Sequence, residues 1–241
     1  MLLNDPIAQG IHDYHFFRKN DPVTIHGEEC DQDEVLPSWF FRTYPEMPLL
    51  EKEALDMAKG TILDIGAGAG CHSLYLQNRG FDVYAVERSE LSCKVMKDRG
   101  IKNVIHADIY QYSGMTFDTL LLLMNGSGIA GTLDQLNNLF LQLKSLLRPG
   151  GTIIMDSTDL IYLYLDENGE TWININSDHY YGEMIFQTEY NGMLSPPFPW
   201  LYVDEETLKE KAKIQNLSIA KIIKGDHYDY LAVLEPKHAA I

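Results

Sequence analysis

Residues 61–70 read TILDIGAGAG, and the pattern changes from apolar to glycine-rich half-way through. The first three residues are β-branched or aliphatic, as expected of a parallel strand buried on both faces, and the strand ends on Asp64. Glycine then occupies every second position, at Gly66, Gly68 and Gly70. Glycine allows positive φ and close approach of the backbone to a ligand. A helix predicted over residues 71–79 would offer unpaired N–H groups to that ligand, so the stretch predicts a cofactor-binding loop.

Two classes of cofactor compete for this loop. The dinucleotide pattern is G-x-G-x-x-G/A, and counted from Gly66 its last small position falls on Cys71. Asp64 lies two residues before the first glycine, where a carboxylate repels a pyrophosphate and attracts a cation such as the ammonium of a methionine group. D-x-G-x-G-x-G after a strand resembles the first motif of the class I S-adenosylmethionine-dependent methyltransferases. The resemblance implies S-adenosyl-L-methionine as cofactor, and an NAD-dependent oxidoreductase is the less favoured alternative.

Polar residues also end the next three predicted strands. Glu87 follows the strand at 81–86, about twenty residues beyond the loop, where an acid binds a ribose diol. After the strand at 103–106, the family resemblance implies that Asp108 accepts the adenine amine and Ile109 packs on the ring. Asn125 follows the apolar strand at 117–124 and is expected at the methyl group. The cofactor-binding residues predicted in this way are Asp64, Gly66, Ala67, Gly68, Gly70, Glu87, Arg88, Asp108, Ile109, Asn125 and Arg42.

The whole chain predicts one α/β domain, with a doubly wound, mostly parallel seven-stranded sheet and an antiparallel last strand. The turn Leu147–Thr152, LRPGGT, also resembles the methyltransferase family. A helix at 204–215 and two strands complete the core. The expected organisation over residues 1–241 is a helical N-terminal cap (1–60), a cofactor-binding core (61–156 and 204–241) and a β-rich insert (157–203).

The cap and the insert each carry an aromatic-rich segment with two interpretations. Arg42 lies among the aromatics of residues 39–44, which either pack on the core while Arg42 reaches water, or fold over the cofactor so that Arg42 meets its carboxylate. The acidic run 28–34 reads as a solvated loop. In the insert, strands are expected at 172–175 and 184–190, and its aromatics either cover a sheet edge or dimer face, or form a substrate lid. We expect both aromatic segments over the carboxyl edge of the sheet, near Asn125.

Composition restricts the partners of the chain. Its 241 residues carry a formal net charge of −16, with a pI near 4.8, which opposes nonspecific binding to nucleic acid. A small-molecule substrate is therefore favoured over nucleic acid, and a homodimer stays open. The three cysteines, Cys30, Cys71 and Cys93, have no C-x-x-C spacing, and no metal site is expected. The sequence also predicts no signal peptide and no membrane-spanning stretch. These features predict a cytoplasmic protein with reduced thiols.

The predicted activity is methyl transfer to a small molecule, driven largely by proximity and orientation. The alternative is a protein or subunit that binds S-adenosylmethionine without catalysis. Residues 125–128 read NGSG rather than an Asn-Pro-Pro-Tyr type motif, and no Pro-Cys pair is present, which disfavours DNA methylation. No catalytic residue is assigned; His12, His15, His179 and the tyrosines of the two aromatic segments are candidates for a base or an orienting group.

Overall fold

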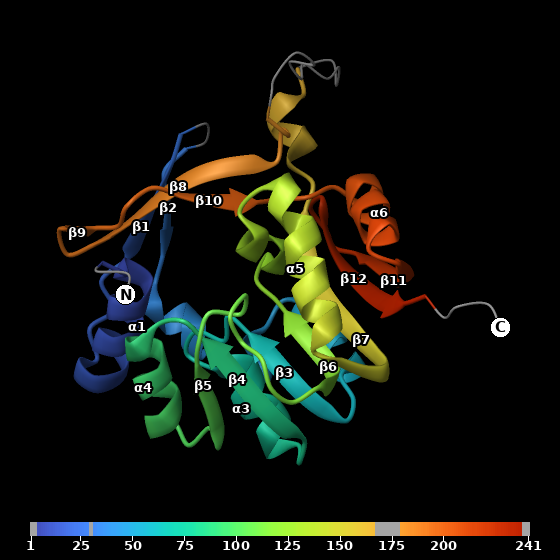
Figure 1. The fold of residues 1–241 in the computed structure, drawn as a ribbon. Helices are drawn as coiled ribbons and strands as arrows, with labels where there is room; N and C mark the ends of the chain where they lie inside the picture. Colours follow the sequence, from blue (N-terminus) through green and yellow to red (C-terminus); the bar gives the residue numbers. More distant parts are fainter. Residues whose placement is uncertain (1–3, 29–30, 167–178, 238–241) are drawn as a thin grey trace.

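The computed structural model describes residues 4–28, 31–166 and 179–237. Its central sheet has seven strands in the order β11-β12-β7-β6-β3-β4-β5 (Figure 1). β12 is antiparallel to β7 and β11, and the remaining neighbours are parallel. The predicted α/β fold is confirmed. The strands are β3 (Thr61–Ile65), β4 (Asp82–Glu87), β5 (Asn103–His106), β6 (Phe117–Leu122), β7 (Leu147–Thr158), β11 (Leu217–Lys224) and β12 (Asp229–Pro236).

Helices cover both faces of this sheet, because alternate strand residues are apolar on both sides. One face packs against α2 (Leu49–Met57), α3 (Cys71–Asn78) and α4 (Glu90–Asp98). The other face packs against α5 (Leu133–Ser145) and α6 (Glu205–Ile214). Side-chain caps begin three of the helices by satisfying free N–H groups, from Ser89 in α4, Thr132 in α5 and Asp204 in α6.

A second sheet combines strands from the cap and the insert, in the order β10-β8-β1-β2 with β9 beside β8. The cap contributes β1 (Val23–Gly27) and β2 (Asp33–Val35), so the expectation of a helical cap with a solvated loop at 28–34 is incomplete. The insert contributes β8 (Glu183–Tyr190), β9 (Met193–Leu194) and β10 (Phe198–Leu201). β8 matches the strand predicted at 184–190, whereas the strand expected at 172–175 lies outside the described residues.

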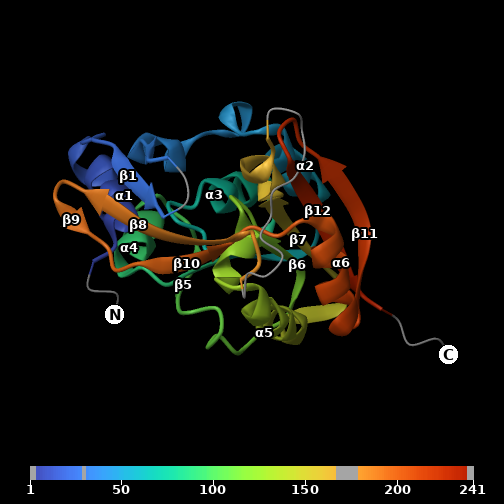
Figure 2. The ribbon, with the colours of Figure 1, turned by 90° about the horizontal axis from the view of Figure 1, so that it is seen from above.

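The second sheet extends from the cap towards β6 and β7, at the carboxyl edge of the central sheet (Figures 1 and 2). The cap also contains α1 (Pro6–Phe17) and the short 3₁₀ helices η1 (Pro37–Phe41) and η2 (Tyr44–Glu46). Ile11 of α1 packs with Ala69 of the glycine-rich loop and Val95 of α4. Two further 3₁₀ turns follow strands of the core, η3 (Gly126–Ala130) after β6 and η4 (Leu160–Tyr164) after β7. The cap therefore lies on the loop that the sequence predicts as the cofactor site.

Candidate active site

The glycine-rich loop between β3 and α3 depends on glycine for two reasons. Gly66, Gly68 and Gly70 have φ angles of 71°, 56° and 77°, which other residues rarely adopt. At Gly70 a β-carbon would also lie 2.2 Å from the side chain of Ile101, so packing alone requires this glycine. At Gly68 the nearest atoms to such a β-carbon are 3.9 Å away, on the side chains of α1 and of Phe40 in η1. The cap therefore lies directly over Gly68.

Acidic side chains end β3 and β4, as predicted. Asp64 is only 2% exposed and accepts a hydrogen bond from Ser73 Oγ at 2.6 Å. The two carboxylate oxygens of Glu87 accept one N–H each, from Gly68 at 3.0 Å and from Ser89 at 2.9 Å. Burial raises the pKa of Glu87, while these two bonds favour its ionised form. Glu87 thus fixes the loop itself, a role that the sequence did not predict.

The third predicted acid, Asp108, follows β5 at the same edge of the sheet. It is exposed and accepts the N–H of Tyr110 at 2.9 Å. Ile109 is buried in the core with the apolar residues of β4 and β6, and Arg88 is exposed. The hydroxyl of Tyr110 lies 3.5 Å from the carbonyl of Ile129 in η3. Burial and, to a lesser extent, the charge of Asp108 raise the pKa of Tyr110 to about 12. Tyr110 is not in the predicted set; its position directly after Asp108 and Ile109 is the one signal that would have suggested it.

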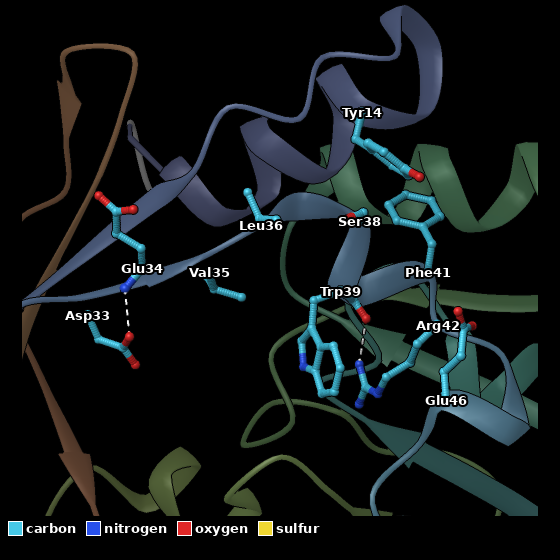
Figure 3. Close-up of a pocket in the computed structure, with 10 residues that line it drawn as sticks. All are labelled: Tyr14, Asp33, Glu34, Val35, Leu36, Ser38, Trp39, Phe41, Arg42 and Glu46. Carbon is cyan, nitrogen blue, oxygen red and sulfur yellow. Dashed lines mark hydrogen bonds between the residues drawn. The ribbon is translucent and has the colours of Figure 1, made fainter.

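Arg42, Glu51 and His72 form a buried ionic cluster between η1, α2 and the start of α3. Arg42 is 5% exposed, and its guanidinium donates to Glu51 from Nε at 3.0 Å and from Nη2 at 2.7 Å. His72 Nε2 lies 2.9 Å from Glu51 Oε2. Arg42 also donates to the carbonyl of Trp39 at 2.8 Å and stacks on its ring (Figure 3). The interpretation in which Arg42 reaches water is wrong, and its contact with a cofactor carboxylate stays a prediction.

The charges within this cluster support one another. Burial alone would raise the pKa of Glu51, but His72 and Arg42 more than offset it and lower the pKa. Burial would likewise lower the pKa of His72, but Cys71 and the carboxylates of Glu51 and Asp64 raise it well above the ordinary value. An ionised Glu51 therefore lies between two cations, the arrangement that a buried carboxylate requires.

β6 ends in a strained turn where the strand order of the sheet reverses. Met124 and Asn125 have φ angles of 66° and 59°, although neither is glycine. Asp156, on β7, accepts the N–H of Met124 at 3.1 Å and that of Gly126 at 2.8 Å. Asn125 Nδ2 donates to the carbonyl of Leu201 at 3.2 Å, while its Oδ1 is buried with no hydrogen-bond partner among the described residues. The sequence predicted Asn125 at this turn but did not indicate Asp156. An acid near the end of a strand is common, and no motif singles this one out.

The insert covers this turn. A β-carbon on Gly128 would lie 1.9 Å from the indole of Trp200 in β10, and Ser127 Oγ donates to the carbonyl of Leu201 at 2.9 Å. β10 therefore lies on η3, as η1 lies on Gly68. Both aromatic segments lie at the carboxyl edge, as predicted, but only β10 lies beside Asn125, whereas η1 lies over Gly68. Their action as a lid stays a prediction.

Residues 63–155 match a family described as a methyltransferase domain. The crystal structure of an S-adenosylmethionine-dependent methyltransferase from Bacteroides fragilis, in complex with S-adenosyl-L-homocysteine, is 43% identical in sequence. The similarity covers 99% of this chain and 97% of that one, with a TM-score of 0.91. The chain belongs to the S-adenosylmethionine-dependent methyltransferases. The predicted family, methyl transfer from S-adenosylmethionine and the cofactor itself are thereby confirmed, and the oxidoreductase alternative is wrong.

Two further relatives of this methyltransferase are more distant than the Bacteroides fragilis protein. A 23S rRNA (uracil(747)-C(5))-methyltransferase from Pyrococcus abyssi is 36% identical over 88 residues, which are 33% of this chain and 22% of that protein. The chain thus matches less than a quarter of the length of that curated relative. The sugar N-methyltransferase KedS8 from Streptoalloteichus is 14% identical, with a TM-score of 0.59 over 87% of this chain and 96% of that one. At that identity the likeness shows a shared fold.

The cap of the methyltransferase also contains a cavity of about 640 Å³ (Figure 3). Trp39 and Arg42 lie on one side of it, and Asp33 and Glu34 of β2 on the other. Its remaining lining residues are Tyr14, Val35, Leu36, Ser38, Phe41 and Glu46. η1 therefore contributes both to this cavity and, through Phe40, to the cover of Gly68.

The candidate bases of the methyltransferase lie in the cap and the insert, and each has a carboxylate nearby. His15 Nε2 lies 2.7 Å from Asp98 on α4, His12 Nδ1 lies 3.2 Å from Asp13, and His179 Nδ1 lies 3.7 Å from Glu183. The hydroxyl of Tyr180 donates to Asp204, the cap of α6. Within residues 4–28, 31–166 and 179–237, no helix is long and apolar enough to cross a membrane, and no three acidic, histidine or cysteine side chains converge as a metal ion requires.

Proposed function

We propose that this methyltransferase transfers the methyl group of S-adenosylmethionine to a small-molecule acceptor. The observation that carries the proposal is the cover over the carboxyl edge of the sheet. η1 lies on Gly68, β10 lies on η3, and pairing of β1 with β8 joins the cap and the insert, to which these two segments belong, in one sheet. A cover formed by the enzyme's own chain excludes water from a reactive methyl group and favours an acceptor small enough to lie beneath it.

The residues at this edge fit the cofactor. Asn125 Oδ1 is buried and has no partner in the described part of the chain, and the acids at the strand ends suit a ligand with two positive charges. We assign Glu87 to the ribose hydroxyls, Asp108 to the adenine amine and Asp64 to the methionine end. When bound, the cofactor supplies an electrophilic methyl group on a sulfonium with a good leaving group. The residues proposed to hold it are Asp64, Gly66, Ala67, Gly68, Gly70, Glu87, Arg88, Asp108, Ile109, Asn125 and Arg42.

Around the end of β6 the protein supplies an excess of negative charge. Glu51 raises the pKa of Asp156 and His72 lowers it, so both charges act on this carboxylate. Asp64 in turn raises the pKa of His72. Among these five side chains the carboxylates of Asp64, Glu51 and Asp156 outnumber the cations Arg42 and His72, which gives an excess of one negative charge. A positively charged ligand would neutralise it, which supports the assignment. Binding, orientation and exclusion of water are then the main tasks of these side chains.

Ribosomal RNA is the second candidate acceptor, favoured by the likeness to the Pyrococcus enzyme over part of the chain. The formal net charge of −16 opposes it, because RNA is bound chiefly through its phosphates by basic surfaces. We therefore place a small molecule first.

Methyl transfer from tritiated S-adenosylmethionine to a panel of metabolites, and in parallel to total ribosomal RNA, tests the proposal. We expect label in at least one metabolite and none in the RNA, and less label with the Glu87→Ala variant at the same cofactor concentration. Calorimetry should show binding of S-adenosylhomocysteine and none of NAD. Labelled RNA together with an unlabelled panel would contradict the small-molecule acceptor.

A further inference from the structure

One carboxylate holds the strained turn at the end of β6. Left-handed backbone at two successive residues with side chains is unfavourable and persists only where the surroundings enforce it. Met124 and Asn125 are such residues, and Asp156 bonds the N–H groups on either side of Asn125. At Gly126 a β-carbon would lie 2.5 Å from Leu122 Cβ, so the turn is also tightly packed against β6.

Asp156 takes part in this turn as an anion. Its side chain is partly buried, and burial is the main cause that raises its pKa to about 6. Glu51 of α2 adds to the rise, whereas the backbone donors and His72 of α3 oppose it. The other elements around Asp156 are as follows. Arg42 is paired with Glu51, the residue opposite Asp156 on β12 is the apolar Leu231, and η3 carries no titratable side chain. At neutral pH both oxygens accept an N–H. After protonation one oxygen becomes a donor, and one of the two bonds is lost.

We propose that Asp156 is a positioning residue, which fixes the turn at residues 124–126 and thereby presents Asn125 to the cofactor. A carboxylate is the one short side chain with acceptors on both terminal atoms. Asparagine would direct an NH₂ group at a backbone N–H. The fixing of the turn follows from the bonds themselves, whereas its effect on the cofactor rests on the proposed function of Asn125.

The test compares Asp156→Asn with a matched control, Asp118→Asn. Asp118 accepts the N–H of Thr61 at 2.7 Å and pairs with Arg148 at 2.8 Å, near the opposite end of β6. Amide hydrogen exchange reports the turn, and calorimetry from pH 5 to 8 reports the affinity for S-adenosylhomocysteine. In Asp156→Asn we expect faster exchange at residues 124 and 126 and a Kd about tenfold higher at neutral pH, the effect of losing a hydrogen bond to a charged group. Asp118→Asn should change neither.

The pH dependence separates positioning from simple stabilisation. Wild-type affinity should fall as the pH drops through about 6, Asp156→Asn should lack this step, and Asp156→Glu should restore part of the affinity. Equal losses in Asp156→Asn and Asp118→Asn would overturn the proposal, as would faster exchange with unchanged affinity. If Asp156→Asn does not fold, a wild-type profile without the step overturns it. No acceptor is needed, so a failed search for a substrate does not affect the result.

Discussion

Glu87 has an observed role in the loop and a proposed role at the ribose, and its substitution should affect both. Its oxygens accept backbone N–H groups from Gly68 and Ser89, and we assign it to the ribose. We expect Glu87→Ala to lower affinity for S-adenosylhomocysteine by about 1.5–3 kcal/mol, the range for hydrogen bonds to a charged group. Because the carboxylate also fixes the loop, the melting temperature should fall as well. Calorimetry and thermal unfolding measure the two effects.

The control for this prediction is Glu90→Ala, since Glu90 is exposed in the first turn of α4, three residues away. It should leave the affinity unchanged. If Glu87→Ala binds as tightly as the control, Glu87 serves the loop alone and the ribose assignment is wrong.

Single residues were predictable where a motif sets their spacing. Asp64, Glu87 and Asp108 lie at or just beyond the carboxyl ends of successive strands, and in a parallel sheet such positions converge at one edge. Asp156 and His72 were not predictable in this way. The role of each depends on a partner from another element, Met124 for Asp156 and Glu51 for His72, and no local pattern records such a contact.

At the level of elements, Glu51 of α2 joins η1 to α3 by ionic contacts. Glu51→Gln would leave the buried guanidinium of Arg42 without its anion, and removal of one partner from a buried pair costs about 3–5 kcal/mol. We therefore expect a large loss in the free energy of unfolding, measured by chemical denaturation at pH 6. Glu53→Gln, a partly exposed residue of the same helix, is the control.

The loss should depend on pH in a defined direction. The pKa of Glu51 is below its ordinary 4.5 in the folded state, so its contribution is present above pH 4.5 and lost as the pH falls through the folded pKa. The pKa of His72 is well above 6.5, so its contribution is present below pH 6.5 and lost as the pH rises through the folded pKa. The difference between wild type and Glu51→Gln should be largest between these limits. A difference that grows towards pH 9 would contradict the ionic cluster.

The elements of the core were predictable, whereas those of the cover were predictable only in part. The apolar runs of the parallel strands are long and sharply bounded, and β5 begins and ends at the predicted residues. β1 and β2 escaped prediction because both are short, and because two of the three residues of β2 are acidic. Their strand conformation depends on pairing with each other and with β8, and strand propensity is set largely by such neighbours.

For the whole molecule, the joined cover predicts that cap and insert respond together to the cofactor. We expect S-adenosylhomocysteine to slow limited proteolysis both at residues 36–44 and at 180–200. Ile25→Pro interrupts β1 between β2 and β8, because proline cannot donate to a sheet and is not tolerated in an inner strand. This variant should be cleaved rapidly in both segments while the core stays folded. Protection of one segment alone would show that they move independently.

The pairing of β1 with β8 also determines when the active site can be completed during synthesis. Thr24 pairs with Glu189, so the ribosome must translate most of the chain before the first cap strands find their partner. Until then β1 and β2 form an isolated two-stranded unit, which is marginally stable in water and exposes an unpaired edge. Contacts between such distant segments form slowly. The strands β4 and β6, which flank β3, are translated before β8. The glycine-rich loop can therefore form before the cover does, and aggregation through the unpaired edge of β1 competes with closure of the cover.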